Sequence, residues 1–308
     1  MKSKGGIERT NPLIQRPIDA RAHRKGVLLM IGASLCWSTG GILVRNVVLT
    51  DSWEIAFWRS LFMVVYMLGL LAVQHRSRMI ERIAEVGVQG VLAGAFMACT
   101  FFLYILSITR TTAANTFVLM SVAPFFMALL GRIFLGEQVN LRTWGAIAGA
   151  LVGIVIMFHA GIDAGHSLGN ILALGIPMAL ASNVIMLRRA GTAVNMVPTV
   201  LLAAIFATLV SLPPAWPLTP TGRDLAVLWV MGWLQLGTGC VLLTMAARHL
   251  PAREIGLLAL LETTLGPIWV WLGIGERPSD LTLIGGVIVV GALVANGWMN
   301  QRDQTNSI

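Results

Sequence analysis

The sequence predicts an all-α polytopic membrane protein with ten transmembrane helices, arranged as two inverted five-helix repeats. Three observations predict this fold: an apolar composition, ten apolar runs of spanning length, and landmarks that recur at a constant offset. Of the 308 residues, 56% are hydrophobic and 12% are charged. Soluble domains carry about 25% charged residues, so this composition is typical of a chain that lies mostly in hydrocarbon.

Each apolar run is close to the ~20 residues that cross a hydrocarbon core of about 30 Å. The connections between runs are short, and the longest contains four prolines between 213 and 220, which do not continue a helix. The expected spans are 26–45, 53–74, 85–107, 112–131, 142–160, 168–187, 196–213, 224–247, 254–273 and 281–299.

The basic residues divide unequally between the two sides that these spans define. Only Arg45, Arg110, Arg223 and Arg277 fall on one side, and Arg59 lies within a span. The rest of the 22 lysines and arginines fall on the other side, many of them in the first 25 residues. Basic loops stay in the cytoplasm, so both termini are expected there. The net charge of +8 therefore reflects membrane orientation, and no nucleic-acid partner is expected.

The two halves of the chain share landmarks at one constant offset, the one that separates Gly26 from Gly169. At the same offset fall Leu29/Leu172, Gly32/Gly175, Arg45/Arg188, Gly94/Gly237, Arg110/Arg253 and Pro124/Pro267, and a four-residue deletion aligns Glu137/Glu276. The expected domains are a basic cytoplasmic tail (1–25), two repeats (26–160 and 166–299) and a second cytoplasmic tail (300–308). Because five spans is an odd number, the second repeat enters the membrane from the opposite side, as in many secondary transporters.

The run Leu257–Glu276 is almost wholly apolar, yet Glu262 lies in its middle. Insertion scales put such an acid at roughly 2.5–3.5 kcal/mol at a helix centre, so it usually faces a hydrated cavity or a partner. We interpret Glu262 as a group that binds a cationic part of a substrate or carries a coupling proton. The alternative is a structural hydrogen bond to a neighbouring helix.

Arg59 is the second charged group within a span, about 9 Å of helix from its start. Three roles are open to it: pairing with Glu262, binding an anionic substrate group, or extending outward to the lipid headgroups. Trp37 and Ser38 lie halfway along the first span, before Gly40 and Gly41. The glycines allow a bend or a close helix crossing there, so we interpret Trp37 and Ser38 as residues that line the substrate site. The alternative is that the serine hydroxyl bonds to its own helix backbone.

Four further polar side chains lie well within the spans: Tyr104, Asn115, Asn183 and Gln235. Each needs a partner, which either a neighbouring helix or a substrate supplies, and together they outline a polar path. Two prolines, Pro124 and Pro267, are expected to kink their helices and to release carbonyls near the site. A further pattern, GxxxGxxxG at 145–153, predicts tight helix packing within the protein or in a dimer.

Several classes of protein are disfavoured by what the sequence lacks. It contains no GxxxxGK[ST], HExxH or GxSxG motif, so neither an ATP-driven pump nor a common hydrolase is expected. The three cysteines are far apart and the five histidines are scattered, so neither a disulfide framework, a metal site nor a cofactor is predicted. Two alternatives to a transporter remain: an intramembrane lipid-modifying enzyme and a non-transporting membrane receptor.

Four segments resemble the drug/metabolite transporter superfamily, in its ten-helix EamA-type branch: CWSTGGILVR (36–45), FWRSLF (57–62), SITRTTAANTFVLMSVAPFFMALLGRIFLGE (107–137) and ARHLPAREIGLLALLETTLGPIWVWLGIGE (247–276). One departure is that Leu180 and Ala181 stand where the second repeat often repeats the tryptophan motif. The resemblance implies a secondary active transporter, often an exporter, that moves a small metabolite or drug-like molecule by alternating access. It also implies protons as a coupling ion. The resemblance further implies a bacterial plasma (inner) membrane, and the chain is expected to work in this lipid bilayer as a monomer or homodimer.

Overall fold

The computed structural model is almost wholly helical, and it describes residues 20–75, 81, 85–136, 141–163, 166–190, 196–246, 249–250 and 252–305. No strand occurs within these ranges. Seven of their helical stretches are long and apolar enough to cross a membrane. The basic tail before residue 20, the last three residues and the landmark Glu137 lie outside the described residues.

The helices follow one another with short connections, and three of the spans are interrupted. In chain order they are α1 (Ala20–Ser38), α2 (Gly40–Arg45), α3 (Ser52–His75), α5 (Gly87–Ile108), α6 (Ala113–Met120), α7 (Ala123–Leu135), α8 (Leu141–Asp163), α9 (Ser167–Ala190), α10 (Met196–Ala215), α11 (Gly222–Val230), the π-helix η3 (Met231–Thr238), α12 (Gly239–Ala246), α13 (Ala252–Ile274) and α14 (Asp280–Thr305). Since α1–α2, α6–α7 and α11–η3–α12 each form one interrupted span, the ten predicted spans are confirmed.

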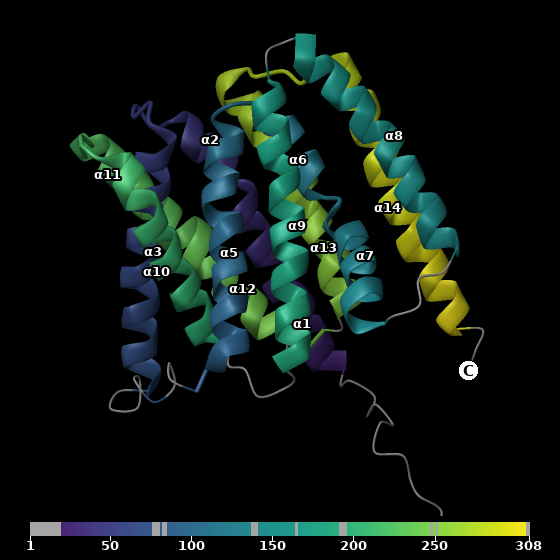
Figure 1. The fold of residues 1–308 in the computed structure, drawn as a ribbon, viewed down its shortest axis with the longest axis horizontal. Helices are drawn as coiled ribbons and strands as arrows, with labels where there is room; N and C mark the ends of the chain where they lie inside the picture. The colour runs from purple at the N-terminus through teal and green to yellow at the C-terminus, as the bar shows by residue number, and fades with distance from the viewer. Residues whose placement is uncertain are drawn as a thin grey trace, which may run out of the picture.

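The two repeats run through the bundle in opposite directions (Figure 1). We call the face that carries the connections 46–51, 109–112, 216–221 and 275–279 the upper face, and the face that carries the start of α1 the lower face. The first span, α1–α2, rises from the lower to the upper face, whereas α9, the first helix of the second repeat, descends from the upper face. The predicted inversion of the second repeat is therefore confirmed.

Glycines at equivalent positions of the two repeats make equivalent contacts. A Cβ on Gly26 of α1 would come within 2.8 Å of His249 and Leu250, and a Cβ on Gly169 of α9 would come within 2.7 Å of the carbonyl oxygen of Arg110. Each glycine thus packs the first helix of its repeat against the connection between the third and fourth spans of the other repeat. This exchange interlocks the repeats and explains why the landmarks recur.

Helices α8 and α14 form a pair at the side of the bundle (Figure 1). A Cβ on Gly153 of α8 would come within 2.6 Å of the carbonyl oxygen of Gly285, and a Cβ on Gly149 would lie 3.7 Å from that of Ala292. Glycines allow such close backbone approach. At Gly149 and Gly153, the predicted tight packing is thus a contact within the chain.

Two apolar clusters meet along α3 and enclose its one buried cation. One cluster joins α3, α5, α10 and α12 and includes Met63, whereas the other joins α2, α3, α5, α6 and η3 and includes Ala56. Arg59 lies on α3 between these two residues and is 1% exposed. A charge in such surroundings is strongly desolvated, so its partners decide what the region can do.

Candidate functional site

Three spans are interrupted within their length. The first breaks at Thr39, between α1 and α2, and the fourth breaks at Ser121 and Val122, between α6 and α7. The eighth passes through η3, where glycines allow a close approach: a Cβ on Gly232 would lie 2.6 Å from the carbonyl oxygen of Arg59. Interrupted helices and π-helical turns commonly mark binding sites in transporters, because they release backbone groups and redirect side chains.

Arg59 occupies the centre of this region without an ionic partner. Its Nη2 donates a hydrogen bond of 2.7 Å to the carbonyl oxygen of Phe101, and its guanidinium carbon lies 5.3 Å from the centre of the Tyr104 ring. Its Nε has no hydrogen-bond partner, and no ion pair joins it to another described residue. Of the three roles predicted for Arg59, extension to the headgroups and pairing with Glu262 are absent from this conformation. The guanidinium instead presents an unused donor inside the protein.

Tyr104 and Gln235 converge on one glycine of the first span. Tyr104 is 6% exposed and Gln235 is 4% exposed, and within the described ranges neither the Tyr104 hydroxyl nor Gln235 Oε1 has a hydrogen-bond partner. A Cβ on Gly40 would come within 2.6 Å of that hydroxyl and within 2.8 Å of Gln235 Nε2. Because Gly40 has no side chain, it leaves room for the Tyr104 hydroxyl and the Gln235 amide beside it.

Trp37 and Ser38 stand at the break in the first span. The Trp37 carbonyl accepts a hydrogen bond of 3.4 Å from Gln235 Nε2, whereas its indole Nε1 is buried without a partner. The Ser38 hydroxyl donates to the carbonyl oxygen of Leu35 at 2.8 Å and accepts from Trp269 Nε1 at 3.0 Å. Trp37 thus keeps an unused donor, while Ser38 is committed to joining α1 and α13.

Glu262 of α13 lies on the same side of its helix as the central aromatic residues. It is half-buried and stands one turn before Gly266, whose position packs directly on the ring of Phe117. That ring contacts the Tyr104 ring edge-on, with centroids 6.2 Å apart. Glu262 is close enough to Tyr104 for an electrostatic interaction, and no hydrogen bond or ion pair joins its carboxylate to another described residue.

We call these five residues, Arg59, Tyr104, Gln235, Trp37 and Glu262, the central site. They come from α3, α5, η3, α1 and α13, so both repeats contribute to it. The site combines a cation, an anion, aromatic rings and unpartnered polar atoms, which is the composition of a site for a polar organic solute.

The two remaining amides lie in helix contacts outside the central site. Asn115 accepts a hydrogen bond of 2.8 Å from the Thr282 hydroxyl and donates to Asn170 Oδ1 at 3.1 Å, near the upper face. Asn183 donates to the carbonyl oxygen of Ala93 at 2.7 Å and thereby joins α9 to α5. For both amides, a neighbouring helix supplies the partner, as the alternative interpretation allowed.

The two prolines differ in their effect on the backbone. Pro124 stands in the first turn of α7, directly after the break that separates α6 from α7. Pro267 lies inside α13, which continues through it from Ala252 to Ile274. Proline fits the first turn of a helix, whereas inside a helix it removes one backbone hydrogen bond. Pro124 therefore marks an interrupted span, and Pro267 leaves its helix continuous.

An ion pair closes the upper face above the central site. Arg45, at the end of α2, lies 2.8 Å from Glu276. Glu276 also accepts a hydrogen bond of 2.8 Å from the backbone N–H of Ala113, and Arg45 donates to the carbonyl oxygen of Thr111 at 3.0 Å. Gly275, with φ of 74°, ends α13 in the left-handed conformation that glycine favours and so turns Glu276 back toward the bundle. We call the Arg45–Glu276 pair the upper latch.

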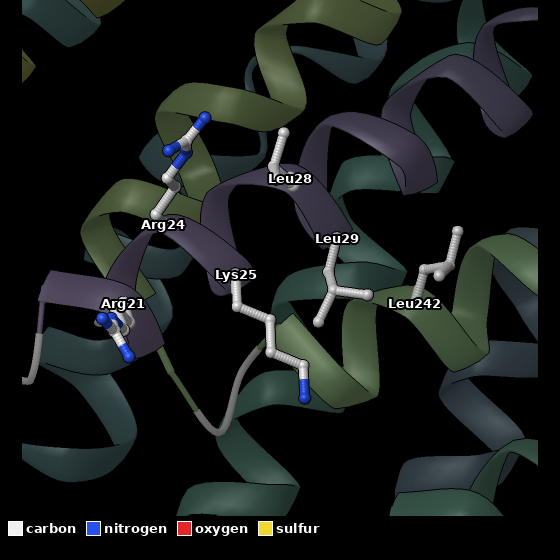
Figure 2. Close-up of a pocket in the computed structure, with 6 residues that line it drawn as sticks. All are labelled: Arg21, Arg24, Lys25, Leu28, Leu29 and Leu242. Atoms are coloured by element: carbon white, nitrogen blue, oxygen red, sulfur yellow. The ribbon is translucent and has the colours of Figure 1, made fainter.

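A cavity of about 390 Å³ lies at the opposite end of the molecule, on the lower face. Figure 2 shows its lining, which combines basic residues of the first turns of α1 with leucines deeper along the helices: Arg21, Arg24, Lys25, Leu28, Leu29 and Leu242. Basic side chains above an apolar floor suit the boundary between headgroups and acyl chains. This cavity contains no member of the central site.

All five members of the central site are residues that the sequence singled out, and their role in binding stays a prediction; the sequence did not predict what surrounds them. It aligned Arg45 and Glu276 with positions of the other repeat and did not pair them with each other. Nor did it find that Gly40 keeps the space for Tyr104 and Gln235. One signal was available: Arg45 is among the few basic residues expected on the upper face, and Glu276 follows the end of a span on that same face.

Comparison with known proteins agrees with this architecture. The model of the EamA-like transporter family matches residues 24–159 and again residues 167–297. The chain is 26% identical over 278 residues to the pseudopaline exporter CntI of Pseudomonas aeruginosa, covering 88% of this chain and 95% of that protein. It is 25% identical over 288 residues to a riboflavin transporter of Rhizobium johnstonii, covering 87% and 89%. A solved crystal structure shares the fold, with a TM-score of 0.61 and 14% identity over 88% of this chain and 96% of that one.

The inverted fold and the two family matches define the class of protein: a multi-pass membrane transporter of small molecules, and not an enzyme. The chain belongs to the EamA-like transporter family. The resemblance noted in the sequence, and the transporter function that it implied, are thereby confirmed.

Proposed function

We propose that this chain exports a small polar metabolite from a bacterial cytoplasm by alternating access, with its lower face and both termini on the cytoplasmic side. One observation carries the proposal: several buried polar atoms between the two repeats have no hydrogen-bond partner among the described residues. Unsatisfied buried groups typically cost about 1–3 kcal/mol each, so a chain retains them where a ligand completes them. The exporter CntI, similar over nearly its whole length, supports the direction.

The arrangement of the upper face supports a closed state on that side. The upper latch joins the end of α2 to the connection after α13 and to the start of α6. Nearby, the Glu54 carboxylate accepts a hydrogen bond of 2.6 Å from the backbone N–H of Thr219, and Asp224 accepts one of 2.7 Å from that of Val48. In our proposal these contacts break when the central site opens to the upper face. The two repeats then exchange conformations, so that the second repeat adopts the one that the first had before.

Glu262 is the proposed coupling group. As a half-buried acid without a partner among the described residues, it can hold either a proton or a cationic group. A proton that enters from outside would then displace the substrate from the same carboxylate, which makes export and proton entry mutually dependent. Each chain contains both repeats and all five residues of the site, so one copy suffices for transport.

The native Cys240 offers a test of alternating access. It is buried on α12 in the same apolar cluster as Phe101, whose carbonyl oxygen accepts the hydrogen bond from Arg59. In a Cys36→Ala, Cys99→Ala background, a membrane-impermeant thiol reagent is expected to reach Cys240 from either side of a proteoliposome, with transported solute changing the balance between sides. A Cys240→Ala protein is the control. Reaction from one side only, under all conditions, contradicts the mechanism.

Orientation is tested with single cysteines on the two faces. Thr50 is exposed on the connection between α2 and α3, and Glu81 is exposed between α3 and α5. In a cysteine-free background, we expect Thr50→Cys to react in intact cells and Glu81→Cys to react only after permeabilisation. The opposite pattern would place the lower face outside and would reverse the proposed direction.

A further inference from the structure

The cavity on the lower face, which we call the lower cavity, is bounded on one side by a single face of α1. Its lining residues there recur at the spacing that places side chains on one side of a helix: Arg21, Arg24, Lys25, Leu28 and Leu29. The remaining lining residue, Leu242, belongs to α12, so the cavity lies where the first repeat meets the second. Figure 2 shows the basic side chains on the first turns of α1 and the leucines further along. The lower cavity therefore has a cationic end and an apolar end.

The order of these side chains along α1 matches the layers of a membrane surface. From Arg21 to Leu28 the helix rises by about 10 Å, at 1.5 Å per residue. The headgroup layer of one leaflet is about 5–8 Å thick, so a helix whose cations lie among the headgroups reaches the acyl chains at its leucines. Leu28 is 61% exposed, and Leu35, further along the same helix, is 43% exposed. These exposed leucines form a surface along which an acyl chain can lie.

The basic side chains of the lower cavity have no acidic neighbour in its described lining. Arg24 and Lys25 are exposed, and neither forms an ion pair with another described residue. Among the described residues that line the cavity, none is acidic. Arginine and lysine side chains only donate hydrogen bonds, and they bind phosphate oxygens through charge-assisted hydrogen bonds. The cationic end is therefore complementary to a phosphate group.

The apolar end decides which phosphate compound fits. A free phosphate ion would use the cations but not the leucines. A zwitterionic phospholipid would cover the leucines but bring its own ammonium group to the cations. The cavity volume of about 390 Å³ lies within the roughly 300–1,000 Å³ of ligand sites, so it holds a headgroup and the first part of a chain. We propose that the lower cavity binds an anionic phospholipid, with its phosphate group at the basic side chains and an acyl chain against the leucines.

A lipid in the lower cavity would contact both repeats. Leu29 and Leu242 pack against one buried apolar cluster that joins the first span to the end of the eighth: Met30, Ala33, Ala246 and Leu250. A ligand that binds the folded chain stabilises it by mass action. Occupancy of the cavity should therefore raise the thermal midpoint of the chain, and this effect does not depend on the proposed transport function.

The test compares phosphatidylglycerol, which is anionic, with phosphatidylethanolamine of the same acyl chains, which is zwitterionic. The full-length chain is purified in a nonionic detergent, and native mass spectrometry counts the lipids that each molecule retains as lipid is added. We expect phosphatidylglycerol to bind at least roughly tenfold more tightly and to raise the thermal midpoint, because the cations attract its net charge. Deacylated phosphatidylglycerol, the headgroup without chains, should compete at least about tenfold more weakly than the intact lipid.

Substitutions locate the bound lipid. Arg24→Gln with Lys25→Gln should weaken phosphatidylglycerol binding by roughly 30-fold, about fivefold for each cation. The exchanged pair, Arg24→Lys with Lys25→Arg, keeps both charges and should keep the preference for the anionic lipid. Leu28→Ser should weaken both lipids by about fivefold, since it removes apolar surface. The matched control, Arg132→Gln with Arg223→Gln, removes the same net charge from exposed positions outside the cavity and should bind like the wild type.

Three results would overturn the proposal. They are equal affinity for the two lipids, wild-type binding of phosphatidylglycerol after both glutamine substitutions in the cavity, and competition by the deacylated headgroup as strong as by the intact lipid. The last result would make the cavity a site for free anions. Because every substituted side chain is exposed, the thermal midpoints without lipid should equal that of the wild type. None of these measurements involves transport, so they test the lower cavity separately from the central site.

Discussion

The upper face and the central site differ in how completely their polar groups are satisfied. At the upper face, Arg45 pairs with Glu276, and Asn115 bonds with Thr282 and Asn170, so that among these groups only Asn170 Nδ2 is buried without a partner among the described residues. In the central site, the Arg59 Nε, the Tyr104 hydroxyl and Gln235 Oε1 are all buried without hydrogen-bond partners in the part of the chain that the structure describes. Both regions contain residues of both repeats. They therefore differ in whether their polar atoms have hydrogen-bond partners, and not in which repeats supply the residues.

The contrast separates structural polar residues from functional ones. A polar group that is satisfied inside the protein contributes to stability, and its loss is felt in folding. A buried group that is left unsatisfied lowers stability and is retained only where a ligand or a conformational change uses it. Substitutions in the two regions should therefore have opposite signatures in stability and in transport.

The largest effect is expected for Arg59→Gln. Loss of a charge-assisted substrate contact should lower kcat/KM for counterflow in proteoliposomes by roughly 10- to 150-fold. Because the cation is buried without an ionic partner, its removal also relieves a desolvation penalty, so the thermal midpoint in detergent should stay the same or rise. Arg223→Gln, on the exposed first turn of α11, should change neither quantity. A lower midpoint with normal transport would place Arg59 among the structural residues.

The fold could be predicted almost completely from the sequence, because the hydrocarbon core restricts the length, composition and charge of the helices that cross it. The spans, the duplication and the inversion follow from those restrictions. The sequence could also show charged residues within spans, since Glu262 and Arg59 violate the restrictions. It could not tell Asn115 and Asn183 from Gln235, because all three are amides within apolar helices. Only the packing of the two repeats decides that the first two meet partners and that Gln235 Oε1 does not.

A smaller effect on the central site is expected for Gly40→Ala. The added methyl group would come within 2.6 Å of the Tyr104 hydroxyl and 2.8 Å of Gln235 Nε2, so both side chains must move. We expect substrate affinity to fall by roughly tenfold, the effect of misplacing one or two polar contacts. Gly69→Ala on α3 is the matched control, since no atom lies within 4 Å of its Cβ position. Unchanged affinity in Gly40→Ala would show that the substrate does not use this space.

At the upper face, Asn115→Ala should affect stability rather than substrate binding. The change removes the acceptor of the buried Thr282 hydroxyl, at a cost of about 1–3 kcal/mol, and one of the two donors to Asn170 Oδ1, which keeps the hydrogen bond from Thr111. Thermal unfolding in detergent should show a lower midpoint, while substrate affinity of the folded fraction stays at the wild-type value. Asn46→Ala is the control, because that exposed amide bonds only to Ile42 of its own helix. A selective loss of affinity in Asn115→Ala would move this residue into the substrate path.

The smallest effect is expected for the upper latch. A partly exposed ion pair contributes at most about 1 kcal/mol, which corresponds to roughly a fivefold change in the ratio of closed to open upper face. Arg45→Ala should therefore increase the rate at which an impermeant thiol reagent reaches Cys240 from the upper side by about that factor. The exchanged pair, Arg45→Glu with Glu276→Arg, should recover part of the closure. Equal rates in all three proteins would mean that other contacts hold the upper face closed.

One helix carries the central acid and ends just before the carboxylate of the latch. From Glu262 to the last residue, Ile274, α13 advances by about 18 Å, at 1.5 Å per residue, and Glu276 follows two residues later. The Trp269 indole, bonded to Ser38, fastens this rod to the break in the first span. A tilt of α13 that accommodates substrate near its middle must also move its upper end, with the Trp269–Ser38 contact as the pivot. Substrate binding at the central site and closure of the upper face are then coupled through the tilt of this one helix. No series of intervening side chains has to transmit the change.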